Sequence, residues 1–329
     1  MSLIAPVRLG SLTIPGNLFM APMAGYTDAA FRALCVRQGA FLCDTEMVSA
    51  EGLARGGART RALLARAPEE EFWAVQLFGA DPRAAAAAAR ALEPLRPTVV
   101  DLNCGCSVPK VLKSGAGAAL LRTPARIGEL VHALRQETEA PVTVKLRSGW
   151  DPGSLNYLET AGAAVAAGAA AVCLHPRTRS QGFTGRADWS QIAELKRRLA
   201  VPVFGSGDLF GAEEAARMVR ETGCDAVMFA RGALGNPFVF AEAGRLFAGL
   251  PPALPPTPGE RLSAGLRQLE TAVQLHGERT ACREMRKHFC AYTRGLAGGA
   301  FLRSRVVAAE TAADYRRLVA EYLEKKDLE

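Results

Sequence analysis

The stretch Pro97-Thr-Val-Val-Asp-Leu-Asn-Cys-Gly-Cys106 decides the fold that we expect for this chain. Its first half is apolar and β-branched, which is typical of a short buried strand, and its second half is typical of a glycine-containing turn. A cysteine therefore stands at the carboxyl end of a predicted strand. Parallel α/β folds place their functional side chains at this end of their strands.

The same pattern, a short apolar run followed by polar residues, recurs along the first three-quarters of the chain. Eight such runs are predicted to be strands: residues 18–21, 41–45, 73–78, 99–102, 142–146, 171–174, 201–204 and 226–229. Helical patterns lie between most of them, over residues 81–92, 123–137, 155–167, 189–199 and 211–222. This alternation predicts an α/β fold of the (β/α)8 TIM-barrel type. A doubly wound open sheet is the alternative, but no GxGxxG motif follows the first strand.

The barrel pattern stops near residue 250, where the run Pro251-Pro-Ala-Leu-Pro-Pro-Thr-Pro258 indicates an extended linker. After this run the apolar residues recur at helical spacing over residues 260–276, 280–296 and 308–325. We therefore expect a catalytic TIM barrel (residues 1–248), a proline-rich linker (249–258) and a small all-helical C-terminal domain (259–329).

Composition narrows the classes of protein that fit. The chain has 329 residues, of which 49% are hydrophobic, so a disordered chain is excluded. A net charge of +7 and a pI of about 9.1 favour an anionic partner. None of the eight cysteines forms a CxxC pair, and no apolar run is long enough to cross a membrane. We expect a monomeric, cytoplasmic protein with reduced thiols, no metal and no membrane partner.

Polar residues at the predicted strand ends indicate a cofactor. The glycine-rich turns at residues 205–208 and 231–232 follow strands seven and eight, the usual phosphate site of this fold. Backbone N–H groups can approach an anion closely where no Cβ intervenes, and Arg231 adds positive charge. Gln76 and Lys145 would face the barrel mouth, where a planar heterocycle needs hydrogen-bond partners. A phosphate and a planar ring together indicate FMN, and ordinary structural turns are the alternative.

These residues belong to a longer series of motifs that resembles the tRNA-dihydrouridine synthases of bacterial type, FMN enzymes that reduce a uridine base in tRNA. The resemblance covers nearly the whole chain. The matching pieces are Met20-Ala-Pro-Met-Ala-Gly-Tyr-Thr-Asp28, Thr45-Glu-Met-Val-Ser-Ala50, Val75-Gln-Leu-Phe-Gly79, Asp101-Leu-Asn-Cys-Gly-Cys106, Pro141-Val-Thr-Val-Lys-Leu-Arg-Ser-Gly-Trp150, His175-Pro-Arg-Thr178, Gly205-Ser-Gly-Asp208, Ala230-Arg-Gly232 and Arg286-Lys-His288.

The resemblance implies roles for individual residues. Cys106, rather than Cys104, matches the catalytic general acid. Asn103 would contact flavin or uracil, and Arg177 would contact the substrate. The residues implied to bind FMN are Ala21, Pro22, Met23, Gln76, Lys145, His175, Ser206, Gly207, Asp208, Ala230 and Arg231.

The resemblance also implies the chemistry and the electron donor, NADPH or NADH. Hydride reaches C6 of uracil and leaves an enolate that needs a proton at C5. A cysteine thiol with an ordinary pKa of about 8.5 is mostly protonated at neutral pH and can donate that proton. Three positions depart from the family pattern: Ser107 replaces a proline, Ser206 an asparagine and Ala230 a glycine.

The helical region carries its own signal for RNA. Between residues 279 and 305 there are seven basic residues and one acid, Glu284. Arg279, Arg283 and the pair Arg286/Lys287 recur at helical spacing and are predicted to share one face. We expect Arg283, Arg286 and Lys287 to contact tRNA phosphates, and a merely solvated surface is the alternative.

Two other functions fit parts of this pattern. An FMN barrel acting on a free pyrimidine or a small enone would not need the basic helical region. A non-enzymatic RNA-binding protein built on a barrel would not need Cys106 or Lys145.

Overall fold

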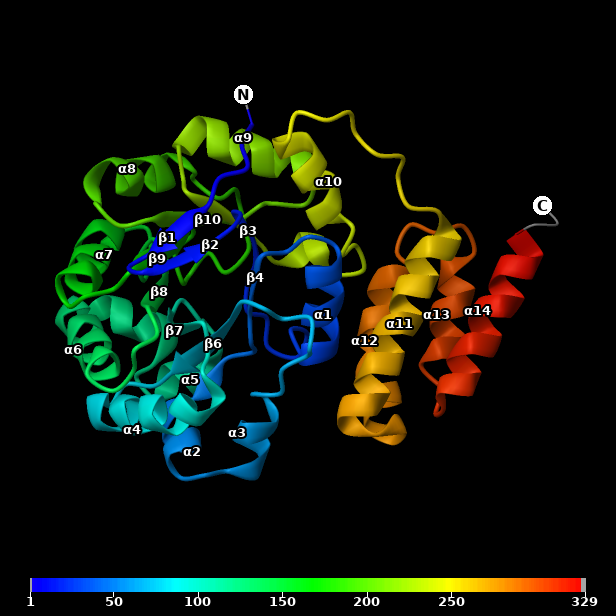
Figure 1. Cartoon of the computed structure of the whole chain (residues 1–329), viewed down its shortest axis with the longest axis horizontal. Coiled ribbons are helices and arrows are strands. Elements are labelled where there is room, and N and C mark those ends of the chain that lie inside the picture. The colour runs from blue at the N-terminus through cyan, green and yellow to red at the C-terminus, as the bar shows by residue number, and fades with distance from the viewer. Residues whose placement is uncertain (1, 327–329) are drawn as a thin grey trace.

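The computed structural model of the protein describes residues 2–326 (Figure 1). Eight parallel strands form its barrel: β3 (Leu18–Met20), β4 (Leu42–Asp44), β6 (Trp73–Phe78), β7 (Val99–Cys104), β8 (Val142–Arg147), β9 (Ala171–His175), β10 (Val203–Ser206) and β11 (Ala226–Phe229). Each strand pairs with its neighbour, and pairing of β4 with β6 closes the ring. The predicted TIM barrel is therefore confirmed, and the open sheet is excluded.

Helices surround the barrel and make up the C-terminal region (Figure 1). Around the barrel lie α1 (Ala29–Arg37), α2 (Ala50–Ala54), α3 (Ala58–Ala62), α4 (Pro82–Leu92), α5 (Pro109–Lys113), α6 (Pro124–Arg135), α7 (Tyr157–Ala166), α8 (Ser190–Arg198), α9 (Ala212–Thr222) and α10 (Val239–Phe247). The C-terminal region contains α11 (Pro258–His276), α12 (Glu278–Tyr292), α13 (Gly299–Val306) and α14 (Ala312–Lys326). Short 3-10 turns cover Glu93–Leu95, Gly117–Arg122 and Arg231–Ala233.

The first residues form a hairpin that the sequence analysis did not anticipate. Strands β1 (Val7–Leu9) and β2 (Leu12–Ile14) pair in an antiparallel manner. Their apolar side chains join one buried cluster with Phe19 and Phe204, whose rings meet edge to face at 5.1 Å. The hairpin therefore covers the apolar end of the barrel interior, where the strands begin. A further two-residue strand, β5 (Val48–Ser49), extends the sheet beside β6.

The interior of the barrel changes from apolar to polar toward the carboxyl ends of the strands. Leu42, Ala74 and Val99 belong to the apolar cluster. Two residues further along the same strands come Asp44, Gln76 and Asp101, which face the same way because side chains alternate along a strand. All three polar side chains are buried. The barrel thus presents a polar layer directly below its mouth.

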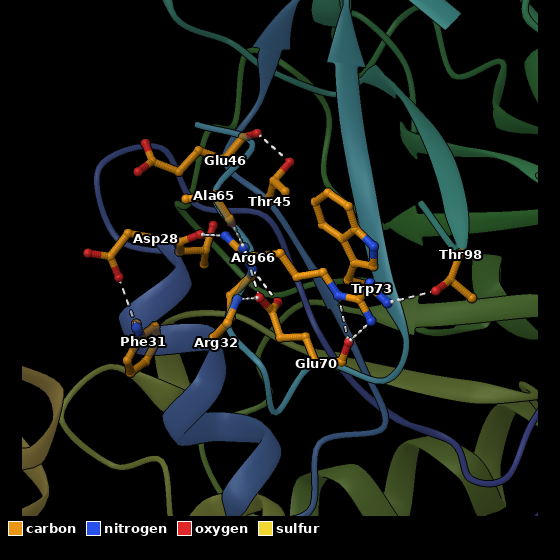
Figure 2. Close-up of polar contacts among 12 residues, drawn as sticks. Asp28, Phe31, Arg32, Thr45, Glu46, Ala65, Arg66, Glu70, Trp73 and Thr98 are labelled. Carbon is orange, nitrogen blue, oxygen red and sulfur yellow. Dashed lines mark hydrogen bonds and ion pairs between the residues drawn. The ribbon is translucent and has the colours of Figure 1, made fainter. Parts of the chain in front are cut away.

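A buried ion pair fixes the first helix to the segment after α3 (Figure 2). Arg32 Nε lies 2.6 Å from Glu70 Oε1, and the two side chains are 1% and 0% exposed. Arg32 also donates to the carbonyl oxygens of Thr27 and Ala65, and Glu70 accepts from the Ala67 N–H. Every strong hydrogen-bonding group of the pair therefore has a partner, as a buried ion pair requires.

The C-terminal helices, called the tail below, pack against α1 beside the barrel (Figure 1). Leu34 of α1 and Phe238 form one apolar cluster with Ala264 and Tyr292 of the tail. Helix α11 begins in a capping box in which Thr257 and Glu260 each bind the other's backbone N–H. The predicted helix over residues 280–296 was too long, because α12 ends at Tyr292 and Gly295 adopts a positive φ of 77°. Within residues 2–326, no helix is both long and apolar enough to cross a membrane.

Candidate active site

A cavity of about 520 Å³ opens at the carboxyl ends of the barrel strands. Every barrel residue that the sequence analysis assigned to the site lines this cavity, except Arg177. These lining residues are Ala21, Pro22, Met23, Gln76, Asn103, Cys106, Lys145, His175, Ser206, Gly207, Asp208, Ala230 and Arg231. The residues predicted for the site come from seven of the eight strand ends. Met47, which follows β4, also lines the cavity, so all eight strand ends converge on one space.

The two cysteines of the turn after β7 have different surroundings. Cys104 is fully buried in the core, whereas Cys106 lines the cavity. Burial raises the pKa of the Cys106 thiol, and this effect outweighs the Val108 N–H bond and the charges of Arg147 and Lys145, which lower it. The thiol at the cavity wall is therefore protonated at neutral pH.

The turn that carries Cys106 is held without a proline directly after the cysteine. Asn103 Oδ1 accepts hydrogen bonds from the N–H groups of Gly105 at 3.2 Å and Cys106 at 2.9 Å. The Cys106 carbonyl accepts from Ala118 N–H at 2.9 Å. Pro109 instead occupies the first turn of α5, where its missing N–H costs nothing. The replacement at Ser107 thus leaves the turn with two independent anchors.

The opposite end of the cavity is suited to an anion. Gly207 and Asp208 have positive φ values of 104° and 55°, and a Cβ on Gly207 would come within 2.8 Å of the His175 ring. The Arg231 guanidinium lies 4.4 Å above the Phe183 ring and 5.3 Å above the Phe210 ring. Stacking between two rings holds this cation at the cavity wall. Arg231 Nη2 also lies 3.7 Å from Asp208 Oδ1 in the same wall. The phosphate site that the turn glycines predicted stays a prediction.

Two of the departures from the family pattern lie at this end. The Ser206 hydroxyl donates to the Met228 carbonyl at 3.1 Å, so it is bound within the barrel. Ala230 precedes the 3-10 turn that carries Arg231 and also lines the cavity. Both positions therefore offer a ligand mainly their backbone, which such side-chain changes preserve.

Arg177 does not line the cavity itself, but its Nη1 lies 3.3 Å from Nε2 of the lining residue His175, and its expected contact with the substrate stays a prediction. Its buried guanidinium binds both oxygens of Asp208, at 2.8 and 2.7 Å, and the carbonyls of Thr184 and Gly185. Although burial works to raise the pKa of Asp208, the Ala187 N–H and the Arg177 guanidinium bring it below its usual value. Arg177 therefore holds the loop after β9 against the phosphate turn.

Arg147, at the end of β8, lines the cavity. Its Nε donates to the Gly105 carbonyl at 2.9 Å, and its Nη1 donates to the carbonyls of Thr178 and Gly182, each at 2.9 Å. Burial, followed by the positive charge of Arg177, lowers the pKa of Arg147 to about 10. The sequence did contain a signal, since residues two apart on one strand, here Lys145 and Arg147, face the same side.

His175 lies against Gly207 in the cavity wall as a neutral imidazole. Burial lowers its pKa well below the ordinary value, and the positive charges of Lys145, Arg147, Arg177 and Arg231 add to this effect. It can therefore bind a ligand through hydrogen bonds but not as a cation.

Not all of the basic residues of α12 extend freely from its surface. Arg283 is exposed, whereas Arg286 donates to the Ala309 carbonyl at 3.1 Å and so turns into the tail. Lys287 pairs with Glu284 and lies 5.5 Å above the ring of Tyr26, a residue of the cavity wall. Residues 286 and 287 diverge because neighbours on a helix point about 100° apart. The tail thus reaches the mouth of the barrel through Lys287.

His288 joins the tail to the barrel. Its ring lies 5.3 Å from the rings of both Tyr26 and Phe31 and is 1% exposed. Burial lowers the pKa of His288 to about 3, with a smaller contribution from Lys287. The imidazole of the folded protein therefore stays neutral at pH values at which the same imidazole in the unfolded chain is protonated.

We expect acid to weaken the protein through His288. Since its pKa of about 3 in the folded state lies below the ordinary 6.5, only the unfolded state takes up this proton between those values. Stability contributed by the neutral ring is thus present above pH 6.5 and lost at about 1.4 kcal/mol per pH unit below it. Urea unfolding at pH 7, 6, 5 and 4 gives the free energy of unfolding of both proteins. Below pH 6.5, that of His288→Phe should rise relative to the wild type by this slope. A constant difference between the two proteins would contradict the prediction.

No group of three or more His, Cys, Asp or Glu side chains that could bind a metal ion occurs in the described part of the chain.

The closed barrel and the polar cavity at the carboxyl ends of its strands define a TIM-barrel protein with its site in the usual place for that fold. A model of the family "Dihydrouridine synthase (Dus)" matches residues 19–326, and the chain belongs to this family.

Similar proteins agree with this assignment. The chain is 42% identical to the probable tRNA-dihydrouridine synthase of Treponema pallidum, over 97% of each chain. It is 36% identical to tRNA-dihydrouridine synthase B of Pseudomonas aeruginosa, over 91% of this chain and 90% of that protein. The structure of histamine dehydrogenase from Rhizobium sp. 4-9 matches with a TM-score of 0.56 and 14% identity, over 82% of this chain and 50% of that chain. This last likeness concerns the fold alone.

Proposed function

We propose that this protein is a tRNA-dihydrouridine synthase that reduces uridine in tRNA, with FMN as cofactor and NADPH or NADH as electron donor. One observation carries the proposal: a single cavity is lined by the Cys106 thiol, which follows β7, and by Arg231, which follows β11 on the opposite side of the barrel. The names of the relatives supply the substrate. We expect a protein with this role to act in the cytoplasm as a monomer.

The residues present fit FMN. Gly207 and Arg231 would hold the phosphate, and Lys145 with the remaining Nε2 hydrogen of Gln76 would bind the ring system. Ala21, Pro22 and Met23 line the same cavity, and its volume of about 520 Å³ suits a small cofactor. When bound, FMN would supply the hydride for C6 of uracil, replenished by the nicotinamide donor.

The protein itself would supply the proton. Cys106 holds its proton at neutral pH because burial raises the pKa of the thiol. As C5 of uracil takes this proton, the S–H bond breaks and a thiolate is left. Arg147, Lys145 and the Val108 N–H stabilise that thiolate, since each of them lowers the pKa of Cys106.

A uridine stacked in tRNA must leave its stack to enter the cavity. We infer that the tail holds the RNA while this happens, with residues 1–248 acting as the catalytic unit, 249–258 as linker and 259–329 as the tRNA-binding unit. Arg283 is exposed for a phosphate contact, and Lys287 lies beside the cavity mouth at Tyr26. Arg286 would support the tail from within.

Arg283→Ala is expected to weaken binding of every tRNA to a similar extent. Losing one phosphate contact should flatten the slope of log affinity against log salt by about 0.7–0.9. Fluorescence anisotropy with labelled tRNA at several salt concentrations measures both quantities. Arg198→Ala is a matched control, because Arg198 is an exposed arginine on α8, across the barrel from the tail (Figure 1). If the Arg283 variant behaves like this control, Arg283 makes no phosphate contact and belongs to a solvated surface.

The proposed function is tested in a strain from which the gene is deleted. Mass spectrometry of its tRNA should show loss of dihydrouridine at one or more positions, and the wild-type gene should restore it. The purified protein should also be yellow and release FMN on denaturation. Unchanged dihydrouridine in the deletion strain, or a colourless protein that takes up no FMN on titration, would count against the proposal.

A further inference from the structure

A chain of buried hydrogen bonds runs from the barrel interior to the turn that carries Cys106. Thr143 Oγ1 donates to Asp101 Oδ1 at 2.6 Å, and Gln76 Nε2 donates to Asp101 Oδ2 at 2.7 Å. Asn103 Nδ2 in turn donates to Gln76 Oε1 at 2.7 Å. Asn103 Oδ1 then accepts from the N–H groups of Gly105 and Cys106. Asp101, Gln76 and Asn103 are each no more than 8% exposed.

The direction of this chain is fixed at both ends. The N–H groups of Gly105 and Cys106 can only donate, so Asn103 must turn its oxygen toward them and its NH2 group toward Gln76. Gln76 must then turn its oxygen toward Asn103 and its NH2 group toward residue 101. The sequence therefore needs an acceptor at position 101, and an ionised carboxylate is an acceptor only.

We propose that Asp101 is a positioning residue, which orients the amides of Gln76 and Asn103 and so holds Cys106 at the cavity wall. The inference rests on the proposed function, in which Cys106 donates the proton. Asp101 acts through two amides, so it touches neither the thiol nor the substrate.

Two substitutions separate this role from simple packing. Asp101→Asn keeps the size of the side chain but replaces a charged acceptor with an amide that can accept or donate, so residue 101 no longer fixes the orientation of Gln76 and Asn103. A reversed Asn103 would turn its NH2 group toward the N–H of Cys106, and the turn would lose its anchor. Combining Asp101→Asn with Gln76→Glu exchanges the two groups: Glu at position 76 accepts from both neighbours, and Asn103 keeps its direction.

The experiment measures how fast iodoacetamide alkylates Cys106 in the purified full-length protein, by mass spectrometry of its peptides. Asp101→Asn should raise the rate about 5–10-fold, the effect of losing about one net hydrogen bond. When compared at equal FMN content, because Gln76 also faces the proposed flavin site, the exchanged pair should return to within about twofold of the wild type, since its hydrogen bonds are restored. Cys290, the other half-buried thiol, lies in the tail and serves as an internal reference. Thr143→Val removes a donor to Asp101 but reverses no amide, so it should leave the Cys106 rate unchanged.

The outcomes decide the proposal without reference to turnover. An unchanged Cys106 rate in Asp101→Asn would overturn it, as would an exchanged pair that fails to restore the rate. Equal effects of Thr143→Val and Asp101→Asn would also overturn it, because the carboxylate would then be merely structural. If Asp101→Asn does not fold, the exchanged pair decides: a folded protein with the wild-type rate supports the role, and an unfolded one refutes it. Failure of the proposed function would appear separately, as a wild-type protein that does not reduce tRNA.

Discussion

Cys106→Ala is expected to lower turnover on tRNA by about 10²–10⁴-fold, the usual contribution of a general acid. FMN content and tRNA affinity should stay unchanged, because the thiol acts in the chemical step. Single-turnover kinetics with pre-reduced protein measure that step directly. Wild-type turnover should also fall as pH rises through the raised pKa of Cys106, since only the thiol form can donate.

Cys104→Ala is the matched control for this prediction. Cys104 lies two residues away but is fully buried in the core, and burial raises its pKa well above the ordinary value. Its loss should lower stability modestly and leave turnover within about tenfold of the wild type. If the Cys104 variant lost more turnover than the Cys106 variant, the assignment of the acid would be wrong.

Glu70→Ala is expected to destabilise the protein by about 3–5 kcal/mol. The substitution leaves the buried Arg32 guanidinium without its carboxylate (Figure 2). It also removes the acceptor of the Ala67 N–H. An unpaired charge in the core costs far more than the net value of the pair itself. Urea unfolding followed by circular dichroism gives the change in the free energy of unfolding.

The neighbouring residue provides the control. Glu69 also pairs with an arginine of α1, Arg37, but those side chains are 25% and 46% exposed. Solvent screens such a pair, so Glu69→Ala should cost no more than about 1 kcal/mol. Equal losses in the two variants would mean that the buried pair contributes nothing beyond a surface contact.

The barrel could be predicted from the sequence because its strands are short apolar runs that end in polar residues. The runs around Val99–Cys104 and Val142–Arg147 were found within two residues of their observed ends. Their local signal is strong because both faces of a parallel strand are buried. The polar residues at those ends could then be assigned to one site, since the carboxyl ends of all barrel strands meet at one mouth.

Contacts between distant segments could not be predicted in the same way. Arg177 and Arg147 are both arginines at strand ends. Only the tertiary structure shows that Asp208 binds Arg177, while Arg147 lines the cavity. Spacing on α12 suggested one basic face, but it could not reveal that the Ala309 carbonyl binds Arg286. The place of His288 between Tyr26 and Phe31 depends on how the tail packs, which no local pattern encodes.

We propose that this cavity reduces uridine within tRNA. The most direct measurement incubates the purified protein with NADPH and an unmodified tRNA transcript, and then analyses the nucleosides by mass spectrometry. We predict that a uridine at a defined position gains two hydrogens and that NADPH is oxidised in equal amount. Oxidation of NADPH with free uridine or a small enone, while the tRNA stays unmodified, would contradict the account.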